Sequence, residues 1–142
     1  MINVRELDHV VIRSRDVMKL SAFYQSALGM VVAKRNDEIG IIHLRAGRSM
    51  IDLVPTSGKL DVPDPRPADD RDRNMDHLCL RVEPFDETAI VTHLQAKGVT
   101  IGKITTRFGA EGDGRSIYFH DPEGNVVELK GPSTWPVNLP RV

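Results

Sequence analysis

The sequence predicts an α+β fold made of two copies of a strand–helix–three-strand unit, and three observations lead to this prediction. The segments Leu7–Arg13 (LDHVVIR) and Met75–Arg81 (MDHLCLR) match, with Asp-His at the same place and an arginine four residues after the histidine. A predicted helix and three predicted strands follow each segment. Both copies end with an acid between apolar residues, in Ile51-Asp52-Leu53 and Val127-Glu128-Leu129. Neither copy buries much core alone, so we expect them to pack into one body.

The first copy is expected over residues 5–55. Leu7–Arg13 alternates like a strand, with His9, Val11 and Arg13 on one face. Asp16 is the expected N-cap of a helix whose apolar residues fall on one stripe, and Gly29 ends that helix. Three short strands are then expected near Met30–Lys34, Ile39–Leu44 and Ser49–Val54.

A connector over residues 56–74 separates the copies, since it is rich in proline and aspartate and has no helix or strand period. The second copy, residues 75–131, is expected to contain a helix capped near Asp86 and stopped by Gly98. Strands should follow near Thr100–Thr105, Ser116–Phe119 and Asn125–Lys130. Residues 132–142, which include Trp135, are expected to form an extended tail. We therefore predict one domain over residues 1–142.

Composition excludes several classes of protein. The chain has 142 residues, and its net charge of −1 gives no electrostatic reason to expect binding to nucleic acid or to a membrane surface. No apolar run approaches the roughly 20 residues of a membrane span, and the N-terminus lacks the apolar core of a secretion signal. The single cysteine, Cys79, rules out an internal disulfide and is expected to be a buried thiol. We expect a soluble, cytoplasmic protein.

The duplication places two histidines and two acids at equivalent positions: His9 and His77, and Asp52 and Glu128. Each of these residues alone is more often structural than functional. Their matched recurrence instead predicts a divalent-metal site, because imidazole and carboxylate ligands suit Zn, Ni, Fe, Co or Mn. Strand alternation directs Asp8 and Asp76 to the opposite faces, so we do not expect them to be ligands. His43 is a weaker candidate.

The pieces LDHVVIR, FYQSALGM, MDHLCLR and SIYFHDPEGNVVEL resemble the vicinal oxygen chelate superfamily, which includes glyoxalase I, fosfomycin-resistance proteins and extradiol dioxygenases. The resemblance covers residues 7–130. It implies two βαβββ modules forming an incomplete β-barrel around a metal, usually in a homodimer. The ligand positions of the superfamily fall on His9, His77 and Glu128, and the fourth falls on Asp52.

Three branches of that superfamily share features with this chain. Tyr118 lies ten residues before Glu128, as in extradiol dioxygenases, but Gly109–Glu111 lacks the histidine that ring cleavage would use. Arg13 matches the substrate-binding arginine of glyoxalase I. GDGRSIYF is similar to the loop of fosfomycin-resistance proteins, where Arg115 would contact a phosphonate. Gly109–Arg115 is accordingly expected to be a flexible lid or an anion cradle.

The resemblance implies a divalent-metal-dependent lyase or isomerase of glyoxalase type, acting on a small substrate that is anionic or a thiol adduct. Glu128 would be a ligand and a base, with Arg13, Arg115 and Tyr118 as further catalytic residues. An epoxide-opening enzyme of the fosfomycin-resistance type, a hydrolase or a thiol transferase, is one alternative. An extradiol dioxygenase or a non-catalytic protein that binds a small ligand is another.

Overall fold

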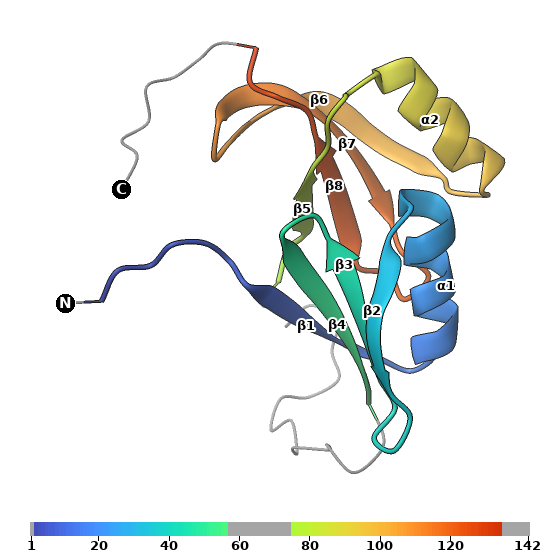
Figure 1. Cartoon of the computed structure of the whole chain (residues 1–142). Coiled ribbons are helices and arrows are strands. Elements are labelled where there is room, and N and C mark those ends of the chain that lie inside the picture. Colours follow the sequence, from blue (N-terminus) through green and yellow to red (C-terminus); the bar gives the residue numbers. More distant parts are fainter. Residues whose placement is uncertain (1, 57–74, 135–142) are drawn as a thin grey trace. The chain divides into compact units, whose positions relative to one another are not determined.

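The computed structural model describes residues 2–56 and 75–134 and divides the chain into two compact units, residues 1–74 and 75–142. Each unit contains one strand, one helix and then three strands (Figure 1), so the predicted pair of βαβββ modules is confirmed. Residues 57–74 of the expected connector, and the expected tail from Trp135 onward, lie outside the described residues. Within the described ranges, no helix has both the length and the apolar character needed to cross a membrane.

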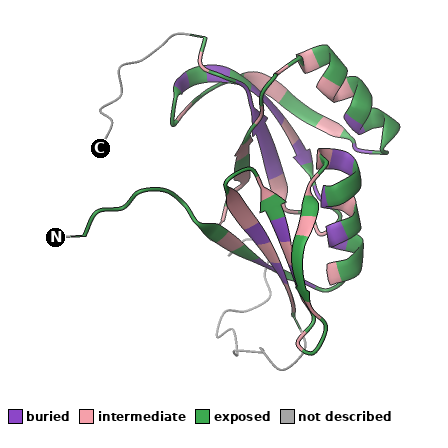
Figure 2. Ribbon diagram, viewed as in Figure 1, coloured by how far each residue is buried: buried purple, intermediate pink, exposed green. Residues whose placement is uncertain are grey.

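The first unit is a four-stranded sheet with one helix. Its elements are β1 (His9–Ser14), α1 (Val17–Leu28), β2 (Val31–Asn36), β3 (Ile41–Ala46) and β4 (Ser49–Pro55). The strand order is β1-β4-β3-β2, and β1 pairs parallel to β4 while the other pairs are antiparallel. Alternate residues of β3 and β4, such as Leu44, Ile51 and Leu53, are buried together with Leu20 and Tyr24 of α1 (Figure 2). The opposite face of the sheet carries the polar candidates.

The second unit repeats this plan. Its elements are β5 (Leu78–Arg81), α2 (Glu87–Ala96), β6 (Ile101–Gly109), β7 (Gly112–His120) and β8 (Val126–Lys130), in the strand order β5-β8-β7-β6. The core residues Ile117, Phe119, Val127 and Leu129 alternate with polar residues along β7 and β8 and are at most 4% exposed. Because successive strand residues point to opposite faces, Glu128 projects from the face opposite to Val127 and Leu129, as predicted.

Both helices begin at the expected aspartates. The Asp16 carboxylate accepts a hydrogen bond of 2.9 Å from the backbone N–H of Lys19, and Asp86 does the same for Ala89 at 3.0 Å. Gly29 follows α1 with φ of 67°, the left-handed conformation that glycine adopts without a steric cost.

The cap of α1 makes a testable prediction about stability. Asp16→Ala should lower the free energy of unfolding by about 1 kcal/mol, because the Lys19 N–H loses its acceptor. Asp16→Asn keeps an oxygen acceptor and should stay near the wild type. Urea unfolding of both variants measures the difference, and equal stabilities of the alanine and asparagine variants would contradict the role of the cap.

Three expectations about local structure were wrong. Gly109–Arg115 is not a loop, because β6 and β7 extend through it and leave only Ala110 and Glu111 as the turn. The strands β1 and β5 begin at His9 and Leu78, later than the repeated motifs suggest. Cys79 is an exposed residue rather than a fully buried one, although its thiol lies beside Glu128, its partner on β8.

Candidate metal centre

The second unit places a histidine against a buried carboxylate. Glu128 is only 3% exposed, and His77, just before β5, lies with its Nε2 2.9 Å from Glu128 Oε2. Two donors that bind one metal at about 2.1 Å in neighbouring positions of an octahedral site are about 3.0 Å apart. The observed separation therefore fits two neighbouring ligands of one ion, as well as an ion pair.

Glu128 is held by three further side chains. Ser116 donates a 2.5 Å hydrogen bond to Oε1, and Tyr118 and Cys79 also donate to the carboxylate. Tyr118 and Cys79 are its cross-strand partners on β7 and β5. Burial alone would raise the pKa of Glu128, but these hydrogen bonds and the charge of His77 outweigh it and lower that pKa. An ionised carboxylate in a fixed orientation suits a metal ligand.

Tyr118 belongs to the same cluster. Its ring makes an edge-to-face contact with His77, with centroids 5.7 Å apart. Burial, followed by its hydrogen bond to Glu128, raises the pKa of Tyr118, against the opposing effect of Arg107. The tyrosine therefore stays a neutral donor at neutral pH. The structure thus brings together three of the predicted site residues, His77, Tyr118 and Glu128.

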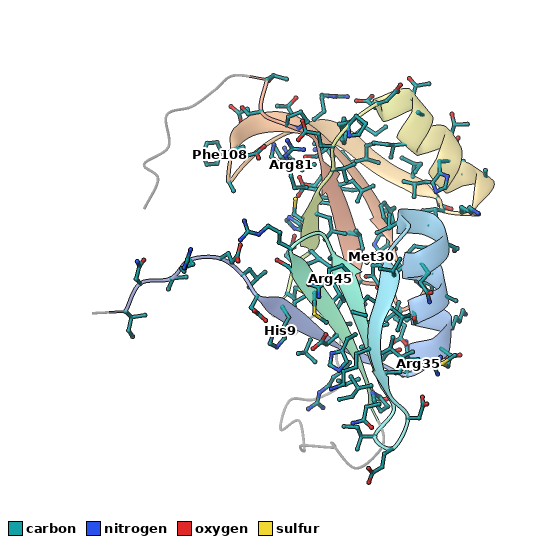
Figure 3. The ribbon with its side chains drawn as sticks, viewed as in Figure 1. His9, Met30, Arg35, Arg45, Arg81 and Phe108 are labelled. Carbon is teal, nitrogen blue, oxygen red and sulfur yellow. The ribbon has the colours of Figure 1, made fainter. Side chains whose placement is uncertain are left out.

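The first unit places His9 and Asp52 on one face of its sheet. Asp52 on β4 pairs with Val11 of β1 and with His43 of β3. Val11 is two residues after His9, so both of them share the face that carries Asp52. His9 is at the start of β1 and is labelled in Figure 3. The hydrogen bond to Asp8 raises the pKa of His9, desolvation lowers it, and the negative charge of Asp52 raises it further. The two residues are therefore electrostatic neighbours.

His43 is the residue of this unit that sequence reasoning undervalued. Its Nδ1 lies 2.8 Å from Asp52 Oδ1. This contact is an ion pair, and Oδ1 accepts no hydrogen bond in the described part of the chain. Burying a carboxylate oxygen without a hydrogen bond is costly, and a cation beside it, either a protonated His43 or a metal ion, would offset that cost.

Asp8 and Asp76 do not point away from the histidines, contrary to the expectation. Asp8 Oδ1 lies 2.7 Å from Nδ1 of His9, and Asp76 Oδ2 lies 2.6 Å from Nδ1 of His77. Both aspartates precede their strands, so the alternation of strand side chains does not govern them. The repeated Asp-His pair was the sequence signal for this arrangement.

The two predicted arginines are placed differently. Arg13 is on β1 two residues after Val11, so it shares the face that carries Asp52. Arg115 instead forms two hydrogen bonds with Glu87 of α2, at 2.8 and 3.2 Å. It is one residue from Ser116 on β7 and points to the helix side. The structure therefore does not bring Arg115 to Glu128.

Over residues 2–56 and 75–134, no group of three or more His, Cys, Asp or Glu side chains is close enough to hold a metal. Each unit taken by itself supplies one histidine and one acid of the predicted set. These nitrogen and oxygen donors and the 2.9 Å separation fit a divalent ion.

Comparison with known proteins identifies the family. The model of the glyoxalase/bleomycin resistance protein/dioxygenase superfamily matches residues 6–129. The chain belongs to this superfamily. It is 33% identical over 134 residues to the glyoxalase domain-containing protein RDO1 of Mycosarcoma maydis, covering 90% of this chain and 69% of RDO1.

Several solved structures share the fold of this chain. An integron cassette protein from the mobile metagenome of V. cholerae superposes with a TM-score of 0.76 and 28% identity, covering 94% of this chain and 99% of that one. A lactoylglutathione lyase from Agrobacterium tumefaciens superposes with a TM-score of 0.63 and 20% identity, covering 92% of this chain and 96% of that one. A mutant of the fosfomycin resistance protein FosX from Listeria monocytogenes superposes with a TM-score of 0.65 and 18% identity, covering 93% of this chain and 94% of that one. That structure is a complex with Mn(II) and 1S,2S-dihydroxypropylphosphonic acid. The last two likenesses concern the fold alone.

Cys79 provides a further test of the Glu128 cluster in this superfamily member. Cys79 is an exposed residue, but partial desolvation of its thiol, followed by the charge of Glu128, raises the pKa of the thiol to about 12. A raised thiol pKa leaves less of the reactive thiolate at any pH below it. In metal-free protein at neutral pH, alkylation of Cys79 by iodoacetamide should be slower than that of an unperturbed cysteine by about a hundredfold or more.

Glu128→Gln removes the negative charge and should accelerate this alkylation. Mass spectrometry of the modified peptide over a pH series measures both rates. An alkylation rate of Cys79 that matches a free cysteine would contradict the described environment of the thiol.

Proposed function

We propose that this superfamily member is a divalent-metal-dependent lyase or isomerase of glyoxalase type, acting on a small α-oxo or hydroxy compound. His9 and Asp52 from one unit, and His77 and Glu128 from the other, would be the ligands, within one chain or across a homodimer. The observation that carries the proposal is the buried Glu128 carboxylate, with His77 Nε2 2.9 Å away. The structure holds these two donors at a separation that suits a shared cation.

The residues around Glu128 suggest separate roles. A bound divalent ion would act as a Lewis acid that stabilises negative charge on a substrate oxygen. Ser116 and Tyr118 hold the Glu128 carboxylate, which its lowered pKa keeps ionised at neutral pH. This lowered pKa suits a ligand better than a general base, whose best pKa is near the working pH. Arg13, on the Asp52 face, would orient an anionic substrate.

An epoxide-opening reaction of the fosfomycin-resistance type is the second candidate. The contact of Asp52 with His43 favours it, because an Asp52 engaged by His43 would leave three protein ligands, His9, His77 and Glu128. The fold shared with the Mn(II) complex of FosX is consistent with this chemistry. The pairing of Arg115 with Glu87 weighs against it, because Arg115 was the expected phosphonate contact.

Metal analysis followed by a substrate screen tests the proposal. Purified protein should bind Ni, Zn, Co or Mn; less than about one tenth of an equivalent after reconstitution would overturn both enzyme functions. The loaded protein is then assayed with the methylglyoxal–glutathione adduct, with other thiol adducts and with fosfomycin. Turnover of fosfomycin alone would replace the first candidate by the second. Metal binding without turnover of any of these compounds would contradict both reactions.

A further inference from the structure

The same side-chain arrangement occurs once in each unit, at the two candidate histidine ligands. The aspartate immediately before each histidine places a carboxylate oxygen on Nδ1, at 2.7 Å in Asp8–His9 and 2.6 Å in Asp76–His77. These pairs precede or begin the edge strands β1 and β5 of separate sheets. Their near-identical distances show that the duplication preserves the pair as well as the histidine.

The exposure of the pairs argues against a role in stability. The side chains of Asp8 and Asp76 are 93% and 95% exposed. Ion pairs and hydrogen bonds at such positions contribute little to folding, because water screens them and competes for both partners. Stabilisation of the fold therefore does not account for the repeated pair.

The chemistry of the contact determines which ring nitrogen is available. A carboxylate can only accept a hydrogen bond, so Nδ1 of each histidine must carry the proton that it donates. Nε2 is then the ring nitrogen that is left to bind a metal. In the second unit this Nε2 is the atom that faces Glu128, at 2.9 Å. The aspartate thus directs the metal-binding nitrogen toward the candidate site.

We propose that Asp8 and Asp76 are positioning residues that hold Nδ1 of His9 and His77 and fix the ring orientation, so that each Nε2 is left to bind the metal. This inference rests on the proposed metal site. Carboxylates behind metal-binding histidines also increase the basicity of the imidazole, and their removal typically weakens metal binding by about 10- to 100-fold. Each aspartate should contribute independently, because each touches a different histidine.

The test measures metal affinity of the full chain by competition with a chromophoric zinc chelator. Asp8→Ala and Asp76→Ala should each weaken Zn²⁺ binding about 10- to 100-fold, and the asparagine variants, which keep an acceptor oxygen, should lose less. Asp37→Ala is the matched control. It removes an equally exposed charge, which pairs with Arg35 at 3.4 Å, and touches neither histidine. Its affinity should equal that of the wild type.

A second measurement detects the bound nitrogen and the remaining ring proton directly. Two-dimensional ¹H–¹⁵N NMR of the Zn²⁺-loaded protein should show His9 and His77 bound through Nε2 and protonated at Nδ1, and the Nδ1 proton should exchange with solvent faster in the matching alanine variant only. Alanine variants that keep wild-type affinity and wild-type Nδ1 proton exchange would overturn the inference while leaving the proposed function intact. A wild-type protein that binds no metal would overturn both. Thermal unfolding verifies that each variant is folded.

Discussion

His77→Ala is expected to weaken metal binding by about tenfold or more, because it removes a direct ligand, and to abolish turnover. His77 contributes both the Nε2 that lies 2.9 Å from Glu128 and the ring that contacts Tyr118. The loss of metal affinity in His77→Ala should exceed that in Asp76→Ala, because His77 would bind the metal directly and Asp76 would only position His77. Calorimetric titration with Zn²⁺ or Co²⁺ measures the affinities.

The fold should survive this substitution. Glu128 keeps its hydrogen bonds from Ser116, Tyr118 and Cys79 when the histidine is absent. His93→Ala is the matched control, because His93 is an exposed histidine of the same unit, on α2. A His77→Ala protein with wild-type turnover would refute the metal site, and a His93→Ala protein with the same loss would show that the effect is not specific.

Gly114→Ala is expected to destabilise the protein by about 1–3 kcal/mol, the usual cost of overpacking a filled interior. A Cβ at Gly114 would be 2.6 Å from Lys130 Nζ, 2.6 Å from the carbonyl oxygen of Pro132 and 2.9 Å from that of Gly131. The backbone oxygens cannot move without shifting the chain after β8. Denaturant unfolding measures the loss.

Gly109 provides the control for this prediction, because its Cβ would meet only side-chain atoms, Lys130 Cε at 2.6 Å and Cδ at 3.0 Å. Lys130→Ala should therefore relieve the strain of Gly109→Ala in the double variant, but leave most of the strain of Gly114→Ala. The two double-mutant cycles separate these cases. Equal relief at both glycines would contradict the close approach of the backbone to Gly114.

The glycines of the β6–β7 hairpin thus have a packing role that the sequence hid. Glycine-rich segments are usually turns or loops, and Gly109–Arg115 was interpreted in that way. In the structure, Gly109 and Gly114 leave room for the Lys130 side chain, whose Nζ is buried with no hydrogen-bond partner among the described residues. Only the pairing of β6, β7 and β8 reveals that neighbour.

The sequence by itself determined the duplicated βαβββ plan, the caps at Asp16 and Asp86, and the face of β8 from which Glu128 projects. These features follow from local periodicity and short-range hydrogen bonds, which a linear pattern records. The tertiary structure decided that Asp8 and Asp76 contact their histidines, that His43 meets Asp52, and that Arg115 pairs with Glu87 across 28 residues. Such contacts depend on strand ends, cross-strand register and helix placement, because these fix which side chains share a face.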